Sequence, residues 1–206
     1  MMFSDSALNS LSLEIEGRLS HKRYAHTLGV ASAARRIASY FPDIDSSEIT
    51  AAALLHDITK EYSEAEHKML ISENDFCDSL EVLHSFSAPS VIRRDFPTYA
   101  TENVLRSVYA HTVGAPDMTL FDEIIFIADY VEDGRTYHTC VKARDGLYTQ
   151  LDEADNVTEC EAALHRAVAF ALSETVKMLK EGARPIHPQT QETLDAMLLR
   201  IDNTKG

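Results

Sequence analysis

A short apolar run that leads directly into a histidine–aspartate pair constrains this chain more than any other feature. The residues from Ala51 to Leu55 are all apolar, and they are followed at once by His56 and Asp57. Such a run predicts a helical segment that is buried in the interior of the fold. Burying an imidazole beside a carboxylate is unfavourable unless another group binds them both. A divalent metal ion suits both donors, and it needs further ligands from other parts of the chain.

Apolar residues recur at helical spacing along most of the sequence, and no segment longer than a few residues alternates as a strand would. Residues 63–71 predict a short peripheral helix on which His67 is solvated, whereas residues 138–158 are polar and give no clear assignment. We expect helices over 5–19, 24–41, from Asp45 into the His56–Asp57 pair, 83–95, 101–111, from Thr119 through Asp129, 159–181 and 189–201. The helix over 24–41 is expected to bury a face made by Leu28, Ala31, Ala34, Ile37, Ala38 and Phe41.

These elements predict an all-α fold built as one compact domain over residues 1–206. An N-terminal helix over 5–19 would precede a core over 22–135 that contains the candidate metal ligands. Helices within 159–201 would complete the domain at its C-terminal side.

The charge and the cysteines narrow the class of protein. The 206 residues carry a net charge of −14, which argues against general binding to DNA or RNA. The three cysteines are isolated and odd in number, which favours a reduced, cytoplasmic chain over a disulfide scaffold. No secretory signal is apparent, and no apolar run approaches the ~18 residues of a membrane span, so we expect neither export nor a membrane partner. The cysteines are Cys77, Cys140 and Cys160.

Two further residues complete a candidate ligand set. His26 lies in the first turn of the helix expected from Tyr24, and Asp129 follows a nearly uninterrupted apolar run, as Asp57 does. A buried aspartate needs a pairing partner or a metal ion. With His56 and Asp57, the set offers two imidazoles and two carboxylates, and it leaves one or two coordination positions for water and substrate.

This ordered pattern, H…HD…D on helices, resembles the HD superfamily of metal-dependent phosphohydrolases. The segments around His26-Thr-Leu-Gly-Val, His56-Asp57-Ile-Thr-Lys60, His111-Thr-Val-Gly-Ala-Pro and Asp129-Tyr-Val-Glu-Asp-Gly-Arg135 resemble one branch of it, the bacterial symmetrical bis(5'-nucleosyl)-tetraphosphatases of the HD type. The resemblance extends from about Arg23 to Pro188.

The resemblance implies a compact HD-domain helical bundle that hydrolyses diadenosine tetraphosphate to two ADP. It also implies a cytoplasmic homodimer with a divalent transition metal, iron first, with manganese, cobalt or zinc as other options. It makes His26, His56, Asp57 and Asp129 the metal ligands. The residues implied to contact the substrate are Arg23, His56, Asp57, Ile58, Thr59, Lys60, His84, His111, Asp129 and Arg135.

Asp57 and Lys60 are the catalytic candidates. Asp57 could orient a metal-bound water or take its proton, and Lys60 could meet a phosphate as a point charge. Arg135 could bind a phosphate through two parallel hydrogen bonds. His84 and His111 could hold phosphate as imidazolium or bind a second metal, and we favour phosphate contact because four other ligands already account for one metal.

Structural roles remain open for several of these residues. Lys60 could pair with Glu61 at the surface, Arg135 could pair with Glu132 or Asp133, and Arg23 could be solvated. His187 between two prolines fits a turn. We expect no functional role for His21, His67, His138 and His165.

Two other functions compete with the tetraphosphatase. One is an HD phosphohydrolase that acts on a nucleoside monophosphate, a triphosphate or a cyclic nucleotide. The other is a non-catalytic regulatory domain that binds a nucleotide and a metal. The complete ligand set and the lack of a second module in this sequence argue against the regulatory domain.

Overall fold

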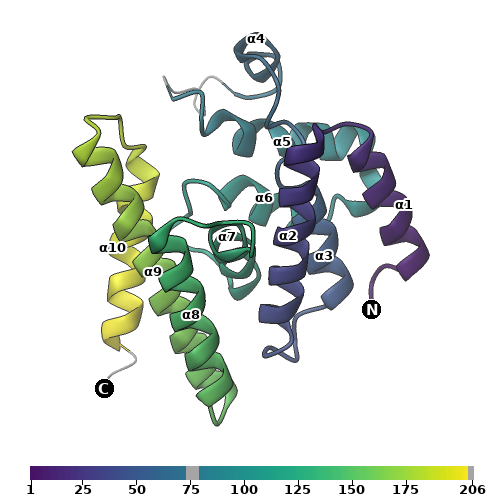
Figure 1. Cartoon of the computed structure of the whole chain (residues 1–206). Helices are drawn as coiled ribbons and strands as arrows, with labels where there is room; N and C mark the ends of the chain where they lie inside the picture. Colours follow the sequence, from purple (N-terminus) through teal and green to yellow (C-terminus); the bar gives the residue numbers. More distant parts are fainter. Residues whose placement is uncertain (73–78, 204–206) are drawn as a thin grey trace.

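The computed structural model describes residues 1–72 and 79–203, and Cys77 and the last three residues of the C-terminal tail lie outside these ranges (Figure 1). Within them the chain is helical and contains no strand, which confirms the predicted all-α class. No described helix combines the length and the apolar character that crossing a membrane requires. The elements are α1 (Asp5–Glu16), α2 (His21–Ala38), α3 (Ser46–Leu55), α4 (Glu64–Lys68), α5 (Leu83–Asp95), the 3-10 helix η2 (Pro97–Tyr99), α6 (Glu102–Ala110), α7 (Leu120–Val131), α8 (His138–Glu153), α9 (Val157–Glu181) and α10 (Pro188–Asn203).

Helix α7 lies at the centre of the arrangement (Figure 1). Helices α2, α3 and α6 pack on one side of it, and α8 and α9 pack on the other, with α10 against α9. Ile124, Ile125 and Ile127 are fully buried because α7 has neighbours around most of its circumference. A helix in this position needs apolar residues on most sides, and its buried acidic residues need partners: Asp122 pairs with Arg106, and Glu123 with His165 and Arg200.

The buried segment predicted at residues 51–55 forms the last half of α3, and every one of its side chains is buried. Its three alanines belong to the same core as Ala34 and Ala38 of α2, the helix that packs against α3. Small side chains let two helix backbones approach closely while the interior stays densely packed. The packing of α2 against α3 therefore brings the residues at the His26 level of α2 close to the end of α3.

The helix starts follow local capping chemistry. The side chain of Asp45 accepts hydrogen bonds from the backbone of Ser47 and Glu48, and Thr119 forms a reciprocal capping box with Asp122. The helix starts at both of these cap residues were predicted. Helix α2 begins at His21 rather than Tyr24, because the Ser20 side chain accepts a hydrogen bond from the backbone of Arg23 and starts the helix earlier.

Three expectations about the helices need correction. Leu28 is 42% exposed, because the buried face of α2 is made by Val30, Ala34 and Ile37 and turns away from it. His67 is only 3% exposed, because the short helix α4 packs against α5 and brings its Nδ1 to within 2.8 Å of Ser87 Oγ. Most of residues 138–158 form α8, whose buried side chains are Cys140, Ala143, Leu147 and Leu151.

The cap of α3 gives a first prediction, for the variant Asp45→Ala. Burial alone would raise the pKa of Asp45, but hydrogen bonds from Ser47 and the amine of Met1 outweigh burial and lower that pKa well below its usual value. Because the folded pKa lies below the unfolded one, Asp45 stabilises the fold above about pH 4, and the contribution fades as the pH falls further. We expect Asp45→Ala to lower the free energy of unfolding by about 1 kcal/mol at pH 7.

Urea denaturation at several pH values measures this difference, which should shrink below about pH 4. Asp43→Ala, at an exposed aspartate of the same loop, is the matched control. An Asp45→Ala variant as stable as wild type at pH 7 would contradict the capping role.

Candidate metal centre

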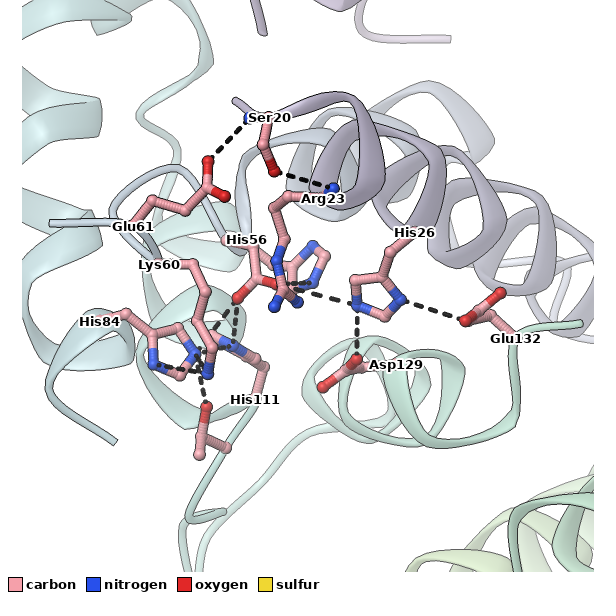
Figure 2. Close-up of polar contacts among 12 residues, drawn as sticks. Ser20, Arg23, His26, His56, Lys60, Glu61, His84, His111, Asp129 and Glu132 are labelled. Carbon is pink, nitrogen blue, oxygen red and sulfur yellow. Dashed lines mark hydrogen bonds and ion pairs between the residues drawn. The ribbon is translucent and has the colours of Figure 1, made fainter. Parts of the chain in front are cut away.

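The four predicted ligands come together from three helices, and Figure 2 shows His26, His56 and Asp129 among them. His26 projects from α2, His56 and Asp57 follow the end of α3, and Asp129 projects from α7. His26 Nε2 lies 2.9 Å from Asp129 Oδ1 and 3.8 Å from Asp57 Oδ2, and His56 Nε2 lies 3.4 Å from the same Asp57 oxygen. The side chain of Asp129 is 22% exposed, so the centre has an opening on this side.

Two buried imidazole nitrogens in this centre, His26 Nε2 and His56 Nε2, make no well-aligned hydrogen bond with any described residue, although each lies close to a carboxylate oxygen. The other nitrogen of His56 lies 2.7 Å from the carbonyl of Ala53, so Nδ1–H donates there and Nε2 presents a lone pair. Buried acceptors without donors are unfavourable in a folded protein. Their convergence with the Asp57 and Asp129 carboxylates fits a divalent cation, and His26, His56 and Asp57 each offer an atom within 4.8 Å of the others.

A second group of donors lies on the other side of Asp57. Asp57 Oδ1 is 3.2 Å from His84 Nε2 and 3.7 Å from His111 Nε2, and these two nitrogens are 3.0 Å apart. Nδ1 of His111 lies 2.6 Å from the carbonyl of Val108, so this ring also presents Nε2 to the centre. Burial lowers the pKa of His84 to about 3, which keeps its ring neutral at pH 7 and weakens the case for an imidazolium.

The charge of Asp57 governs the electrostatics of the centre. Burial would raise the pKa of Asp57, but His56 and its other imidazole neighbours outweigh burial and lower it. In turn Asp57 outweighs the burial of His56 and raises the pKa of that imidazole. A positive charge is therefore favoured at this point, whether it is a proton or a metal ion.

Three basic residues border the centre. Arg23 Nη1 lies 2.7 Å from Asp57 Oδ2, and Arg135 Nη2 lies 2.6 Å from Asp129 Oδ1. Lys60 Nζ lies 3.2 Å from His84 Nδ1, and burial lowers the pKa of this lysine. Lys60 and Arg23 bind groups of the centre instead of taking the surface roles that had been left open for them. Arg135 contacts Asp129 and also forms the pair with Glu132 that had been left open, with Nε 4.0 Å from Glu132 Oε1.

Two predicted substrate contacts have their side chains in the interior instead. Ile58 is part of the hydrophobic core, and Thr59 is buried with its hydroxyl donating to the carbonyl of His84 at 2.8 Å. The prediction placed them at the substrate because they lie inside the His56–Lys60 motif. The turn after α3 directs them inward, where they hold the motif in place.

A family model described as the HD domain matches residues 23–134, which is more than half of the sequence. This chain belongs to the HD domain family. A relative from Halalkalibacterium halodurans named "Bis(5'-nucleosyl)-tetraphosphatase, symmetrical" is 29% identical over 90% of this chain and 94% of its own. A Staphylococcus aureus protein of the same name is 32% identical over 65% of this chain and 70% of its own.

A solved structure shares the fold of this HD protein. It is a Clostridium acetobutylicum protein described as a predicted HD superfamily hydrolase involved in NAD metabolism, and it superposes with a TM-score of 0.77 at 25% identity. The match covers 97% of this chain and 100% of that one. The family resemblance seen in the sequence is thereby confirmed, and so is the HD-domain helical fold.

Glu132 is a residue of this HD domain whose place in the sequence indicated only a pairing with Arg135. Its Oε1 lies 3.1 Å from His26 Nδ1, and its Oε2 accepts a hydrogen bond from the backbone of Gly134 at 2.6 Å. A carboxylate that contacts the far nitrogen of a metal-binding histidine fixes the tautomer and the orientation of the ring. A Cβ atom at Gly29 would overlap Glu132 Oε2, so the glycine three residues after His26 makes room for this carboxylate.

A buried chain of hydrogen bonds holds His84 from behind. Nδ1 of His67 contacts the hydroxyl of Ser87, which donates to the hydroxyl of Thr59 at 2.9 Å, and Thr59 donates to the carbonyl of His84. These hydrogen bonds connect α4 and α5 to the turn that carries Asp57. His67, for which no functional role was predicted, therefore supports the position of a residue of the centre.

The contact of Glu132 with Gly29 gives a second prediction, for the variant Gly29→Ala. The added methyl group must displace the Glu132 carboxylate, so His26 loses its orienting partner. We expect roughly a tenfold to a hundredfold loss of metal affinity, as is typical when such a partner is removed. Titration of the metal-depleted protein with manganese or iron measures the change.

Gly146→Ala is the matched control, because Gly146 also lies in a helix and its Cβ would meet nothing within 4 Å. The control should keep the metal affinity of the wild type. Equal affinities of Gly29→Ala and wild type would rule out the orienting role of Glu132.

Proposed function

We propose that this protein hydrolyses symmetrical dinucleoside tetraphosphates and cuts diadenosine tetraphosphate into two ADP. The observation that carries the proposal is the convergence of His26, His56, Asp57 and Asp129, with two imidazole nitrogens among them that make no well-aligned hydrogen bond to a described residue. The relatives named as symmetrical tetraphosphatases support the choice of substrate, since one of them matches nearly the whole chain. In keeping with this, we propose that residues 1–206 act as one domain around the centre.

We propose that these four residues bind a divalent transition metal, with iron first and manganese, cobalt or zinc as the other options. The donor chemistry supports a metal of this class, because imidazole and carboxylate together suit it. When bound, such an ion acidifies a coordinated water and polarises a phosphoryl oxygen. Asp57 is the residue that would orient this water or accept its proton.

For His84 and His111, the contacts support the role of a second metal site more than the phosphate contact we favoured from the sequence. Their facing nitrogens and Asp57 Oδ1 form a compact donor set in which each residue offers an atom within 4.8 Å of the others. The lowered pKa of His84 removes the positive charge that would attract a phosphate. We therefore propose that Asp57 serves both sets, one through each oxygen.

The basic residues have a separate task in this proposal. A tetraphosphate is strongly anionic, and a chain with a net charge of −14 must attract it with local positive charge. Arg23 and Arg135 already point at the carboxylates of the centre, so each can turn from a carboxylate to a phosphate over a short distance. Lys60, beside His84, supplies a further positive charge on the same side.

We further propose that the protein acts in the cytoplasm and as a homodimer. Cys140 and Cys160 are free and buried thiols, which supports a reducing compartment. The dimer rests on the resemblance to the tetraphosphatase branch.

Hydrolysis of another nucleotide is the second candidate function. The solved structure described as involved in NAD metabolism favours keeping it, because that protein shares the fold over its whole length. Both candidate functions would use the same chemistry at the centre, so only the reaction products distinguish one function from the other.

The metal proposal gives a third prediction, for Asp57→Ala and His111→Ala. Asp57→Ala removes a ligand from both donor sets, so the protein should lose its metal and its activity together. His111→Ala should reduce the metal content from two ions per chain to one. Elemental analysis of the purified variants measures both, with His21→Ala as a control at an exposed histidine.

Wild-type metal content and turnover in Asp57→Ala would exclude its role as a ligand. One ion per chain in both wild type and His111→Ala would return His111 to the phosphate role.

The substrate proposal gives a fourth prediction. Chromatography of the products from diadenosine tetraphosphate should show ADP alone, formed at two molecules per substrate. AMP with ATP would indicate asymmetric cleavage. Phosphate released from a nucleoside monophosphate, with diadenosine tetraphosphate left intact, would favour the second candidate function. Binding of ADP without cleavage of any nucleotide would favour a regulatory domain.

A further inference from the structure

The turn over residues 132–137 joins α7 to α8 and carries Arg135. Inside the turn, the backbone N–H of Arg135 donates to the carbonyl of Glu132 at 2.9 Å, and the Glu132 carboxylate accepts from the backbone of Gly134 at 2.6 Å. The turn therefore carries both the carboxylate that orients His26 and the guanidinium proposed to bind phosphate. Because a turn lacks the repeating hydrogen bonds of a helix, its position depends on contacts with neighbouring elements.

One arginine of α8 holds this turn at two backbone carbonyls. Arg144 Nη2 donates to the carbonyl of Arg135 at 2.7 Å, and Arg144 Nη1 donates to the carbonyl of Glu132 at 3.4 Å. The side chain of Arg144 is only 13% exposed, so water competes little for these hydrogen bonds. Nη1 also lies 3.5 Å from Asp133 Oδ1, but that aspartate is almost fully exposed and the ion pair contributes little.

The position of Arg144 is fixed by the packing of its helix. Helix α8 packs against α7 and α9 (Figure 1). Its far end also contacts the C-terminal end of α2, the helix that carries the first metal-binding histidine. There the hydroxyl of Tyr40 donates to the Asp152 carboxylate, and the Arg36 guanidinium lies 3.6 Å from the centre of the Tyr148 ring. Arg144 thus holds the turn from a helix whose own place is set at both ends.

The hold of Arg144 on the turn matters most when Arg135 binds a phosphate. In this structure the Arg135 side chain also contacts Asp129, with Nε 3.0 Å from its carbonyl and Nη2 2.6 Å from its Oδ1. The bond to the carboxylate is lost when the guanidinium turns to a phosphate. The bond from Arg144 to the Arg135 backbone does not involve that side chain, so it persists. A backbone that is already fixed lowers the entropy that binding must remove.

We propose that Arg144 is a positioning residue for phosphate binding, which fixes the turn over residues 132–137 and thereby directs Arg135 to the phosphates of the substrate. This inference rests on the proposed function, because it takes Arg135 to be a phosphate contact. Arg144 acts through the turn and not by touching the substrate. An arginine suits this role better than a lysine, because its planar fork donates to two carbonyls at once.

The test is a double-mutant cycle on ADP binding to the manganese-loaded protein, measured by calorimetry. Arg144→Ala should weaken ADP binding roughly tenfold, because the turn must then be ordered on binding. Arg135→Ala should weaken it as well. In the Arg135→Ala background, Arg144→Ala should cause no further loss, because the residue through which Arg144 acts is already absent. The same tenfold loss in both backgrounds would overturn the inference, and so would wild-type ADP binding by Arg144→Ala.

Arg144→Lys separates positioning from charge, and it also serves if the alanine variant does not fold. It keeps the positive charge but cannot donate to both carbonyls, so it should weaken ADP binding nearly as much as Arg144→Ala. Wild-type ADP binding by Arg144→Lys would show that charge is enough, and the inference would fall.

Arg166→Ala is the matched control. Arg166 is an exposed arginine of α9 that donates to Gln150 of α8, so its loss removes one positive charge and one contact of α8 without touching the turn. This control should bind ADP as wild type does. Manganese content is measured on every variant and should not change. A loss of manganese from Arg144→Ala in proportion to its loss of ADP binding would contradict a role in phosphate binding.

The inference and the proposed function fail in different ways. If the cycle shows that Arg144 acts through Arg135 but wild type leaves diadenosine tetraphosphate intact, the positioning role stands and the proposed reaction falls. If wild type forms two ADP but Arg144→Ala weakens ADP binding equally in both backgrounds, the reaction stands and the positioning role falls.

Discussion

The carboxylate of Asp57, buried among four imidazoles, is the interaction on which the rest of the structure depends. One oxygen faces His26 and His56 and the other faces His84 and His111, so a single negative charge joins both donor groups. A buried charge persists only when the surrounding groups compensate it. The fold meets this requirement by packing α2, α3 and α7 closely and by placing Arg23 at the open side.

The burial of His56 and Asp57 behind an apolar run is the reason that much of the centre could be predicted from the sequence. A run of apolar residues that ends in His56 and Asp57, or in Asp129, indicates an ionisable group in the interior before any contact is known. The helix starts at Asp45 and Thr119 could be predicted for another reason, since each cap depends on residues within one turn. Both the apolar runs and the helix caps depend on residues that are close together in the sequence, so they can be read from it directly.

The errors arose where a residue's partner lies far along the chain. The charged residues that flank His67 indicate a solvated position, but it packs against Ser87, 20 residues away, and is buried. Glu132 contacts His26 across 106 residues, which no local pattern indicates. Helix α8 was not assigned, because only every third or fourth side chain of it is buried and the rest are polar.

Gly29 contributes to the metal centre because its missing side chain leaves space for another residue. Glycine inside a helix lowers helix stability by roughly 1 kcal/mol relative to alanine. Helix α2 accepts this loss because the volume left free is filled by the carboxylate of another helix terminus, at Glu132. A programme of thermostabilisation that replaced helical glycines without regard to their surroundings would strengthen this helix and, by the same substitution, loosen the ring of His26. Position 29 is thus a point where the rigidity of the scaffold and the precision of the centre oppose each other.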